Sequence, residues 1–162
     1  MNILIPISSY SSFFPKNEFY FPKPLVEVVG QPMIALVVNR LKAIFPNSNF
    51  IFVVNSDDSR SFSLDLTLNL LAGPSTVVIE KSDITAGALC SCLLAIDSVD
   101  HSLPLIISNC DQLIDYDLSR SIAYFESQSA SAGVITFDSV HPRWSYIIKD
   151  YQTNLVLQAV EK

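Results

Sequence analysis

A lysine held between two prolines is the residue of this chain best suited to bind an anion. Lys23 lies between Pro22 and Pro24, and a proline disfavours helical backbone in the residue before it. The lysine is therefore expected in an extended segment, where its ammonium group can reach a phosphate. For an isolated Pro-Lys-Pro, an exposed surface lysine without a ligand would be the more common interpretation.

A run of hydroxyl side chains precedes this lysine, in a long loop over residues 8–24. Its members are Ser8, Ser9, Ser11 and Ser12. Serine hydroxyls and backbone amides can bind phosphate. The run contains no glycine, which would let the backbone approach closely, and no arginine, which would offer a bidentate contact. The length of the loop is unusual for a connection without a function.

Two further places combine small or acidic residues with the expected end of a strand. Thr85, Ala86, Gly87 and Ala88 stand where a strand should lead into a helix. A base or sugar can pack against small residues there, and the start of a helix favours anions. Asp111 follows an expected buried strand, and a carboxylate at that position can hold Mg²⁺. The alternatives are close helix packing for the Gly-Ala pair and capping of the next turn for Asp111.

Apolar runs that alternate with helical patterns predict the elements that must position these residues. Strands are expected at residues 3–7, 50–54, 76–79, 105–108 and 133–137, followed by a hairpin of 145–148 and 155–160. Helices are expected at residues 32–45, 64–71, 86–95 and 115–127, with Thr85 as the cap of the third, and Asp57 and Asp58 as further caps. This order predicts an α/β fold with a mainly parallel sheet and an antiparallel hairpin near the C-terminus. Ligands bind beyond the carboxyl ends of the strands in such sheets.

Composition limits the class of protein. The chain has 162 residues, 49% of them apolar and 16% charged, with a net charge of -6. This size predicts one domain, and the absence of a basic stripe argues against nucleic acid. No apolar run approaches the roughly 18–20 residues of a membrane helix, so we expect a cytoplasmic protein. The rich apolar content leaves open a homo-oligomer, and Cys90, Cys92 and Cys110 are expected to be reduced, buried thiols.

The order of motifs along the chain resembles that of the sugar-phosphate nucleotidyltransferases. The resemblance begins with the apolar strand, the loop, Pro-Lys-Pro-Leu at 22–25 and Gly-Gln-Pro-Met-Ile at 30–34. It continues through Thr-Ala-Gly-Ala at 85–88 and Asn-Cys-Asp at 109–111, and it ends at Glu161-Lys162. The family typically has a Gly-rich loop with an arginine where this chain has serines and Phe13, and a glycine where this chain has Ile84.

This resemblance implies a three-layer, Rossmann-like α/β sandwich of the GT-A-like type. It also implies transfer of a nucleotidyl group from an NTP to a sugar 1-phosphate, or a similar phosphorylated acceptor, with release of pyrophosphate. Lys23 would be catalytic, Asp111 would hold Mg²⁺, and the serine loop and residues 85–88 would bind the nucleotide. Glu161 and Lys162 would bind the acceptor.

The family's catalytic domain usually continues beyond the Glu-Lys pair, so we expect this chain to lack that later part. Two alternatives to the enzyme remain. One is a non-catalytic module that binds a nucleotide or sugar phosphate through a degenerate phosphate loop. The other is an assembly domain that uses its apolar surface to pair subunits.

Overall fold

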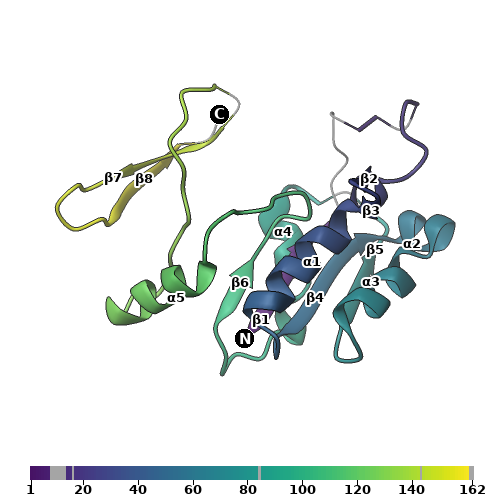
Figure 1. Cartoon of the computed structure of the whole chain (residues 1–162), viewed down its shortest axis with the longest axis horizontal. Helices are drawn as coiled ribbons and strands as arrows, with labels where there is room; N and C mark the ends of the chain where they lie inside the picture. Colours follow the sequence, from purple (N-terminus) through teal and green to yellow (C-terminus); the bar gives the residue numbers. More distant parts are fainter. Residues whose placement is uncertain (8–13, 16, 84, 143, 161–162) are drawn as a thin grey trace. The chain divides into compact units, whose positions relative to one another are not determined.

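The computed structural model describes residues 1–7, 14–15, 17–83, 85–142 and 144–160, and it divides into two compact units (Figure 1). The first unit is Met1–Leu118 and the second is Ser119–Lys162. In the part of the chain that the structure describes, no helix has both the length and the apolar character needed to cross a membrane.

A four-stranded parallel sheet forms the centre of the first unit. Its strands are β1 (Asn2–Pro6), β4 (Asn49–Asn55), β5 (Val77–Lys81) and β6 (Leu105–Ile107), in the order β5-β4-β1-β6. All three pairings are parallel, and Ile3 lies between Phe50 on one side and Ile106 on the other. Because β1 and β4 are buried on both faces, their sequences are nearly continuous apolar runs. The predicted parallel sheet is confirmed.

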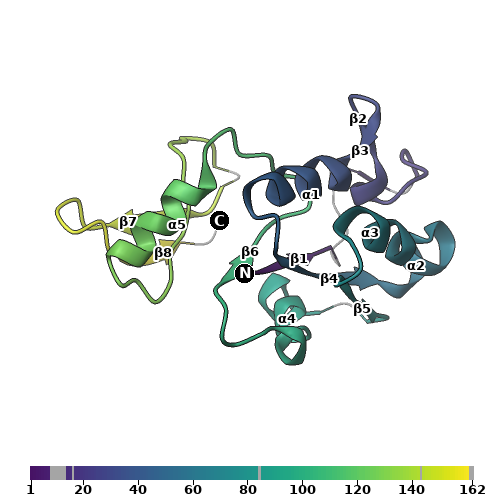
Figure 2. The ribbon, with the colours of Figure 1, turned by 60° about the horizontal axis from the view of Figure 1, so that its bottom comes forward.

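Helices cover both faces of this sheet and make a three-layer α/β sandwich. α1 (Met33–Ile44) and α3 (Leu64–Ala72) lie on one face, and α4 (Ala88–Leu93) lies on the other (Figure 2). Alternate residues of β1 face opposite sides of the sheet. Ile3 and Ile5 pack in the larger core with α1 and α3, whereas Leu4 packs in a smaller core with Ala95. This alternation follows from the period of two in a strand. The predicted fold class is confirmed.

Several short elements lie around the sheet and were not expected as helices or strands from the sequence. They are the 3-10 turns η1 (Lys23–Leu25) and η2 (Ile96–Ser98), the hairpin of β2 (Glu27–Val28) and β3 (Gln31–Pro32), and α2 (Ser56–Phe62). The hairpin turns through Val29 and Gly30, both with positive φ, as its tight turn requires.

The start of α2 corrects one prediction. Asn55, at the end of β4, is the N-cap, and its side-chain oxygen accepts a hydrogen bond from the Asp57 N–H at 2.8 Å. Asp57 and Asp58 lie in the first turn instead of capping the helix. Carboxylates are favourable there because the start of a helix carries partial positive charge.

The second unit contains most of α5 (Leu118–Ser127) and a hairpin of β7 (Tyr146–Lys149) and β8 (Val156–Val160). The hairpin is antiparallel, pairs Tyr146 with Val160, and turns through Asn154 with a positive φ of 58°. This confirms the predicted hairpin. The helix begins at Leu118, three residues after its predicted start.

The predicted strand over residues 133–137 is wrong. This segment has no regular secondary structure, and three of its apolar side chains, Val134, Ile135 and Phe137, are exposed. A strand needs a neighbour to pair its backbone groups, and none of the described strands pairs with it. Its high content of β-branched and aromatic residues was therefore a misleading local signal.

Candidate functional site

The order of the strands creates a natural crevice between β1 and β6. The chain builds the sheet outward from β1 to β4 and then β5, and it returns to add β6 on the other side of β1. In open α/β sheets, ligands bind beyond the carboxyl ends of the strands at such a reversal point. The loops after β1 and β6 therefore bound the expected site.

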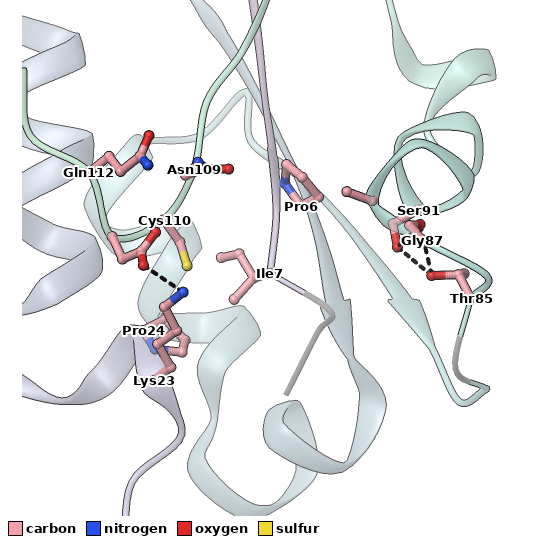
Figure 3. A pocket seen from close by; sticks show the side chains of 12 residues that line it. Pro6, Ile7, Lys23, Pro24, Thr85, Gly87, Ser91, Asn109, Cys110 and Gln112 are labelled. Carbon is pink, nitrogen blue, oxygen red and sulfur yellow. Dashed lines mark hydrogen bonds and ion pairs between the residues drawn. The ribbon is translucent and has the colours of Figure 1, made fainter. Parts of the chain in front are cut away.

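A cavity of about 280 Å³ lies at this point (Figure 3). Pro6 and Ile7, from the end of β1, lie between its two sides. One side is formed by Lys23 and Pro24 with the loop after β6, residues 109–112, and the other by the segment before α4. The lining residues of that second side are Thr85, Gly87, Ala88 and Ser91. The structure thus brings together three of the motifs that the sequence singled out.

Lys23 reaches this cavity because of the prolines on either side of it. Pro22 has extended backbone, with φ -63° and ψ 152°, and the chain then makes the 3-10 turn η1, in which Pro24 is buried. The backbone N–H of Leu25 donates to the Pro22 carbonyl at 2.8 Å and closes this turn. The prediction that Lys23 lies in extended backbone is therefore wrong: Pro22 is extended, and Lys23 begins a tight turn.

The ammonium of Lys23 forms an ion pair with Asp111. The Lys23 Nζ lies 2.6 Å from the Asp111 Oδ2, and the two side chains are 22% and 31% exposed. Exposed pairs contribute about 0–1 kcal/mol to stability. The value of this contact is therefore mainly geometric: it places one cation and one anion on the same side of the cavity.

Cys110 lies beside this pair and forms an uncharged part of the lining. Burial raises the pKa of its thiol to about 11, while the nearby Lys23 lowers the pKa and Asp111 raises it by smaller amounts. All three cysteines are free, as expected. The expectation that they are buried holds for Cys110 but is wrong for Cys90, which is exposed, and Cys92 is intermediate.

The opposite side of the cavity is organised by hydroxyl groups. The Thr85 Oγ1 lies 2.6 Å from the Ser91 Oγ, and Thr85 also donates to the Gly87 carbonyl at 3.3 Å. Gly87 is the N-cap of α4, which begins at Ala88, so the prediction that Thr85 caps this helix is wrong. Ala86 is exposed and is not among the residues that line the cavity.

Ser91, Asn109 and Gln112 line the cavity but were missed as site residues. A serine within a predicted helix carries no signal by itself. Its position four residues after Gly87 is the only sequence clue, because a helical side chain at that spacing can bond back to the carbonyl.

Six predicted site residues lie outside the described residues. Four belong to the serine loop, and the other two are the predicted acceptor contacts: Ser8, Ser9, Ser11, Ser12, Glu161 and Lys162. Their proposed roles remain predictions, as does the effect of Phe13.

The carboxylate of Asp111 is of the kind that binds Mg²⁺ together with the phosphates of a bound substrate. Among the described residues no group of three or more His, Cys, Asp or Glu side chains could form an all-protein metal site. Asp111 is a single, partly exposed carboxylate at the cavity. Mg²⁺ is usually bound by one or two carboxylates together with substrate phosphates, so one carboxylate of this kind is compatible with it.

Comparisons with solved structures show where this fold occurs. The chain is similar over its whole length to a nucleoside-diphosphate-sugar pyrophosphorylase from Vibrio cholerae, with 21% identity and a TM-score of 0.74, and it covers 67% of that chain. The chain is also similar to HddC from Yersinia pseudotuberculosis, with 16% identity and a TM-score of 0.69. This match covers 99% of the present chain and 69% of HddC.

A third match is the inositol-1-phosphate CTP transferase from T. maritima, at 15% identity and a TM-score of 0.67, with 98% of this chain and 63% of that one covered. The chain thus spans about two thirds of the length of these structures. Curated protein sequences gave no match.

The family itself is shown by a sequence model described as nucleotidyl transferase, which matches residues 19–162. The matched region includes Lys23, Asp111 and the segment at 85–88, and the cavity lies where the fold places ligands. The chain belongs to the nucleotidyl transferase family.

Proposed function

We propose that this chain carries a nucleotidyl transfer site that joins an NTP to a sugar 1-phosphate, or a similar phosphorylated acceptor, and releases pyrophosphate. The observation that carries this proposal is the meeting of Lys23 and Asp111 in one cavity, at the reversal point of the sheet. The segment from Thr85 to Gly87 lies across the same cavity. Such a reaction requires positioning and charge stabilisation and no protein nucleophile.

The charges of the lining suggest how the nucleotide is held. Lys23 and Asp111 are the charged residues of the described lining, and their formal charges cancel. A triphosphate therefore needs additional positive charge, which Mg²⁺ held by Asp111 would supply. Lys23 would then exchange its contact with the carboxylate for contacts with phosphate oxygens, to which its ammonium can donate.

The opposite side would receive the nucleoside. Gly87 leaves open space beside the backbone, since a Cβ built there would meet no atom within 4 Å. Thr85, Gly87 and Ala88 are small, so a base or ribose could lie against them. Ser8, Ser9, Ser11 and Ser12 would complete the phosphate contacts, and Ala86 would support the loop from outside the cavity.

The acceptor proposal rests on the sequence and on related proteins. The T. maritima protein is named for inositol 1-phosphate, and another structural match, from Bacillus anthracis, is named for glucose 1-phosphate. We infer that Glu161 and Lys162 contact an acceptor of this type. The pathway would be nucleotide-sugar or cell-surface polysaccharide biosynthesis in the cytoplasm, and the chain would assemble as a homo-oligomer.

One observation favours a second candidate, a module that binds a nucleotide or sugar phosphate without turnover. Phe13 stands where related enzymes carry an arginine, and Ser9 and Ser11 stand where they carry glycines. Phenylalanine supplies no charge to a transition state, although binding could persist through Lys23.

Calorimetric titration with ATP, GTP, CTP and UTP, each with Mg²⁺, separates these functions. An enzyme should bind one NTP and release pyrophosphate when glucose 1-phosphate or inositol 1-phosphate is added. Binding without pyrophosphate release would favour the module. Absence of binding to all four nucleotides would contradict the enzyme, and absence of binding to the phosphorylated acceptors as well would contradict the module.

A further inference from the structure

Two hydroxyl groups and a carbonyl lie together on the side of the cavity that would receive the nucleoside. The Ser91 Oγ lies 2.6 Å from the Thr85 Oγ1, and the two oxygens lie 3.5 and 3.3 Å from the Gly87 carbonyl oxygen (Figure 3). Ser91 is only 2% exposed, whereas Thr85 is half-buried and lines the cavity.

The distances restrict where the hydroxyl hydrogens can lie. Each hydroxyl has one hydrogen, and two oxygens 2.6 Å apart must share one between them. If Thr85 donates to Ser91, its hydrogen is used in that bond. If Ser91 donates to Thr85, the Thr85 hydrogen is directed to the Gly87 carbonyl. In both arrangements Thr85 retains a lone pair that can accept from a ligand, and its own hydrogen has an acceptor within the cluster.

The Ser91 hydroxyl is not needed to build the helix. The backbone N–H of Ser91 already donates to the Gly87 carbonyl at 3.1 Å, which closes the first turn of α4. The 2.6 Å contact of its side chain restrains the Thr85 hydroxyl in addition to this backbone bond.

We propose that Ser91 is a positioning residue that holds Thr85 as a hydrogen-bond acceptor toward the cavity, so that Thr85 selects a donor group on the nucleotide. This inference rests on the proposed function. Phosphate oxygens only accept hydrogen bonds, so Thr85 is matched to the nucleoside and not to the phosphates. The donor is either an N–H of the base or a hydroxyl of the ribose.

The test compares nucleotides and variants by calorimetry with Mg²⁺ present. The probes are the tightest binder among ATP, GTP, CTP and UTP, its form methylated on the N–H groups of the base, and its 2′-deoxy form. Thr85→Val keeps the shape of the side chain and removes the acceptor. It should weaken binding of the parent nucleotide by about three- to tenfold, the range of one net hydrogen bond.

The modified nucleotides identify the donor. The wild-type protein should bind either the methylated or the deoxy form more weakly than the parent nucleotide, by a similar factor. Thr85→Val should bind that form and the parent nucleotide with equal affinity. A loss with the methylated form assigns the donor to the base, and a loss with the deoxy form assigns it to the ribose.

Tripolyphosphate serves as the control ligand because it lacks a nucleoside. Its affinity should be unchanged in Thr85→Val and in Ser91→Ala, and it should fall in Lys23→Met. Ser91→Ala should reduce the discrimination between the parent nucleotide and the sensitive modified form, because the Thr85 hydrogen is then held inward only by the longer 3.3 Å contact to the Gly87 carbonyl. A variant that only loosened the fold would weaken tripolyphosphate and nucleotide alike, which would overturn the proposal.

The remaining outcomes separate the proposed function from the roles of Thr85 and Ser91. If no nucleotide binds to the wild-type protein, the proposed function and this inference are both wrong. This inference alone is wrong if the wild-type protein binds the parent nucleotide and both modified forms equally tightly, and Thr85→Val binds the parent nucleotide as tightly as the wild-type protein does.

Discussion

The ammonium of Lys23 lies 2.6 Å from the carboxylate of Asp111, although one residue belongs to a proline-rich loop near the N-terminus and the other follows the last strand of the parallel sheet. The pair forms because the sheet places β6 directly beside β1. It joins the predicted phosphate contact to the predicted metal ligand at one side of one cavity.

The pair should matter far more for ligand binding than for folding. The free energies of unfolding of Lys23→Met, Asp111→Asn and the double variant should each lie within about 1 kcal/mol of the wild-type value. The effect is small because the two side chains are partly exposed. Chemical denaturation checks this expectation. A coupling energy well above 1 kcal/mol would show that the contact is a structural support of the fold.

Asp111 should make nucleotide binding depend on magnesium. Because Lys23 and Asp111 cancel each other's charge, the wild-type protein should be stabilised by NTP with Mg²⁺ more than by NTP with EDTA. In Asp111→Asn this difference in melting temperature should be largely lost. Asp115→Asn is the matched control, since Asp115 is an exposed carboxylate four residues away that does not line the cavity. Equal behaviour of the two variants would contradict the assignment.

Gly87 should be tolerant of substitution in the free protein and intolerant of it in the complex. Its φ of 166° is ordinary extended backbone, and an added Cβ would meet no atom within 4 Å. Gly87→Val should therefore melt close to the wild-type temperature and bind the preferred NTP about tenfold or more weakly, a loss near 1.4 kcal/mol.

Gly73→Ala provides the opposite control. Gly73 ends α3 with φ 109°, a conformation that strains any other residue, so this variant should lose about 1 kcal/mol of stability. It lies away from the cavity lining and should keep its NTP affinity. If Gly87→Val binds NTP as well as Gly73→Ala does, the nucleoside does not lie on this segment.

Cys110 should remain a neutral thiol over the physiological range. Burial raises its pKa to about 11, so in the metal-free protein about one thousandth of it is thiolate at pH 8. Iodoacetamide should modify the exposed Cys90 far faster, and the rate at Cys110 should rise about tenfold per pH unit from 8 to 10 without a plateau. Mass spectrometry of the labelled peptides measures both rates, and similar rates at pH 8 would contradict the burial of Cys110.

Much of the first unit was predictable because its signals are local and strong. β1 and β4 are nearly continuous apolar runs, α1 ends shortly before Pro46, and α3 ends directly before Gly73. The resemblance to the family, carried by Lys23 and its prolines, is confirmed by the family match. Thr85 and Asp111 were correctly placed beyond strand ends, where the cavity lies.

The errors occur where a neighbour in space decides the outcome. Residues 133–137 have the composition of a strand but have no partner among the described strands. Asn55 caps α2 because, at the end of β4, its side-chain oxygen lies close enough to accept from the Asp57 N–H. The presence of Asp57 and Asp58 in the sequence did not predict this contact. The contact between the Ser91 and Thr85 hydroxyls depends on the fold of the turn before α4, so the sequence pattern did not predict it.

The most direct test of the central claim is pyrophosphate release by the purified chain. Each NTP is incubated with Mg²⁺ and glucose 1-phosphate or inositol 1-phosphate, and wild-type protein is compared with Lys23→Met. We predict release that requires both NTP and acceptor and that falls by about a hundredfold or more in Lys23→Met, the loss expected for a group that stabilises transferring charge. Release that survives unchanged in Lys23→Met, or no release from any pair although an NTP binds, would contradict the proposed transfer reaction at this site.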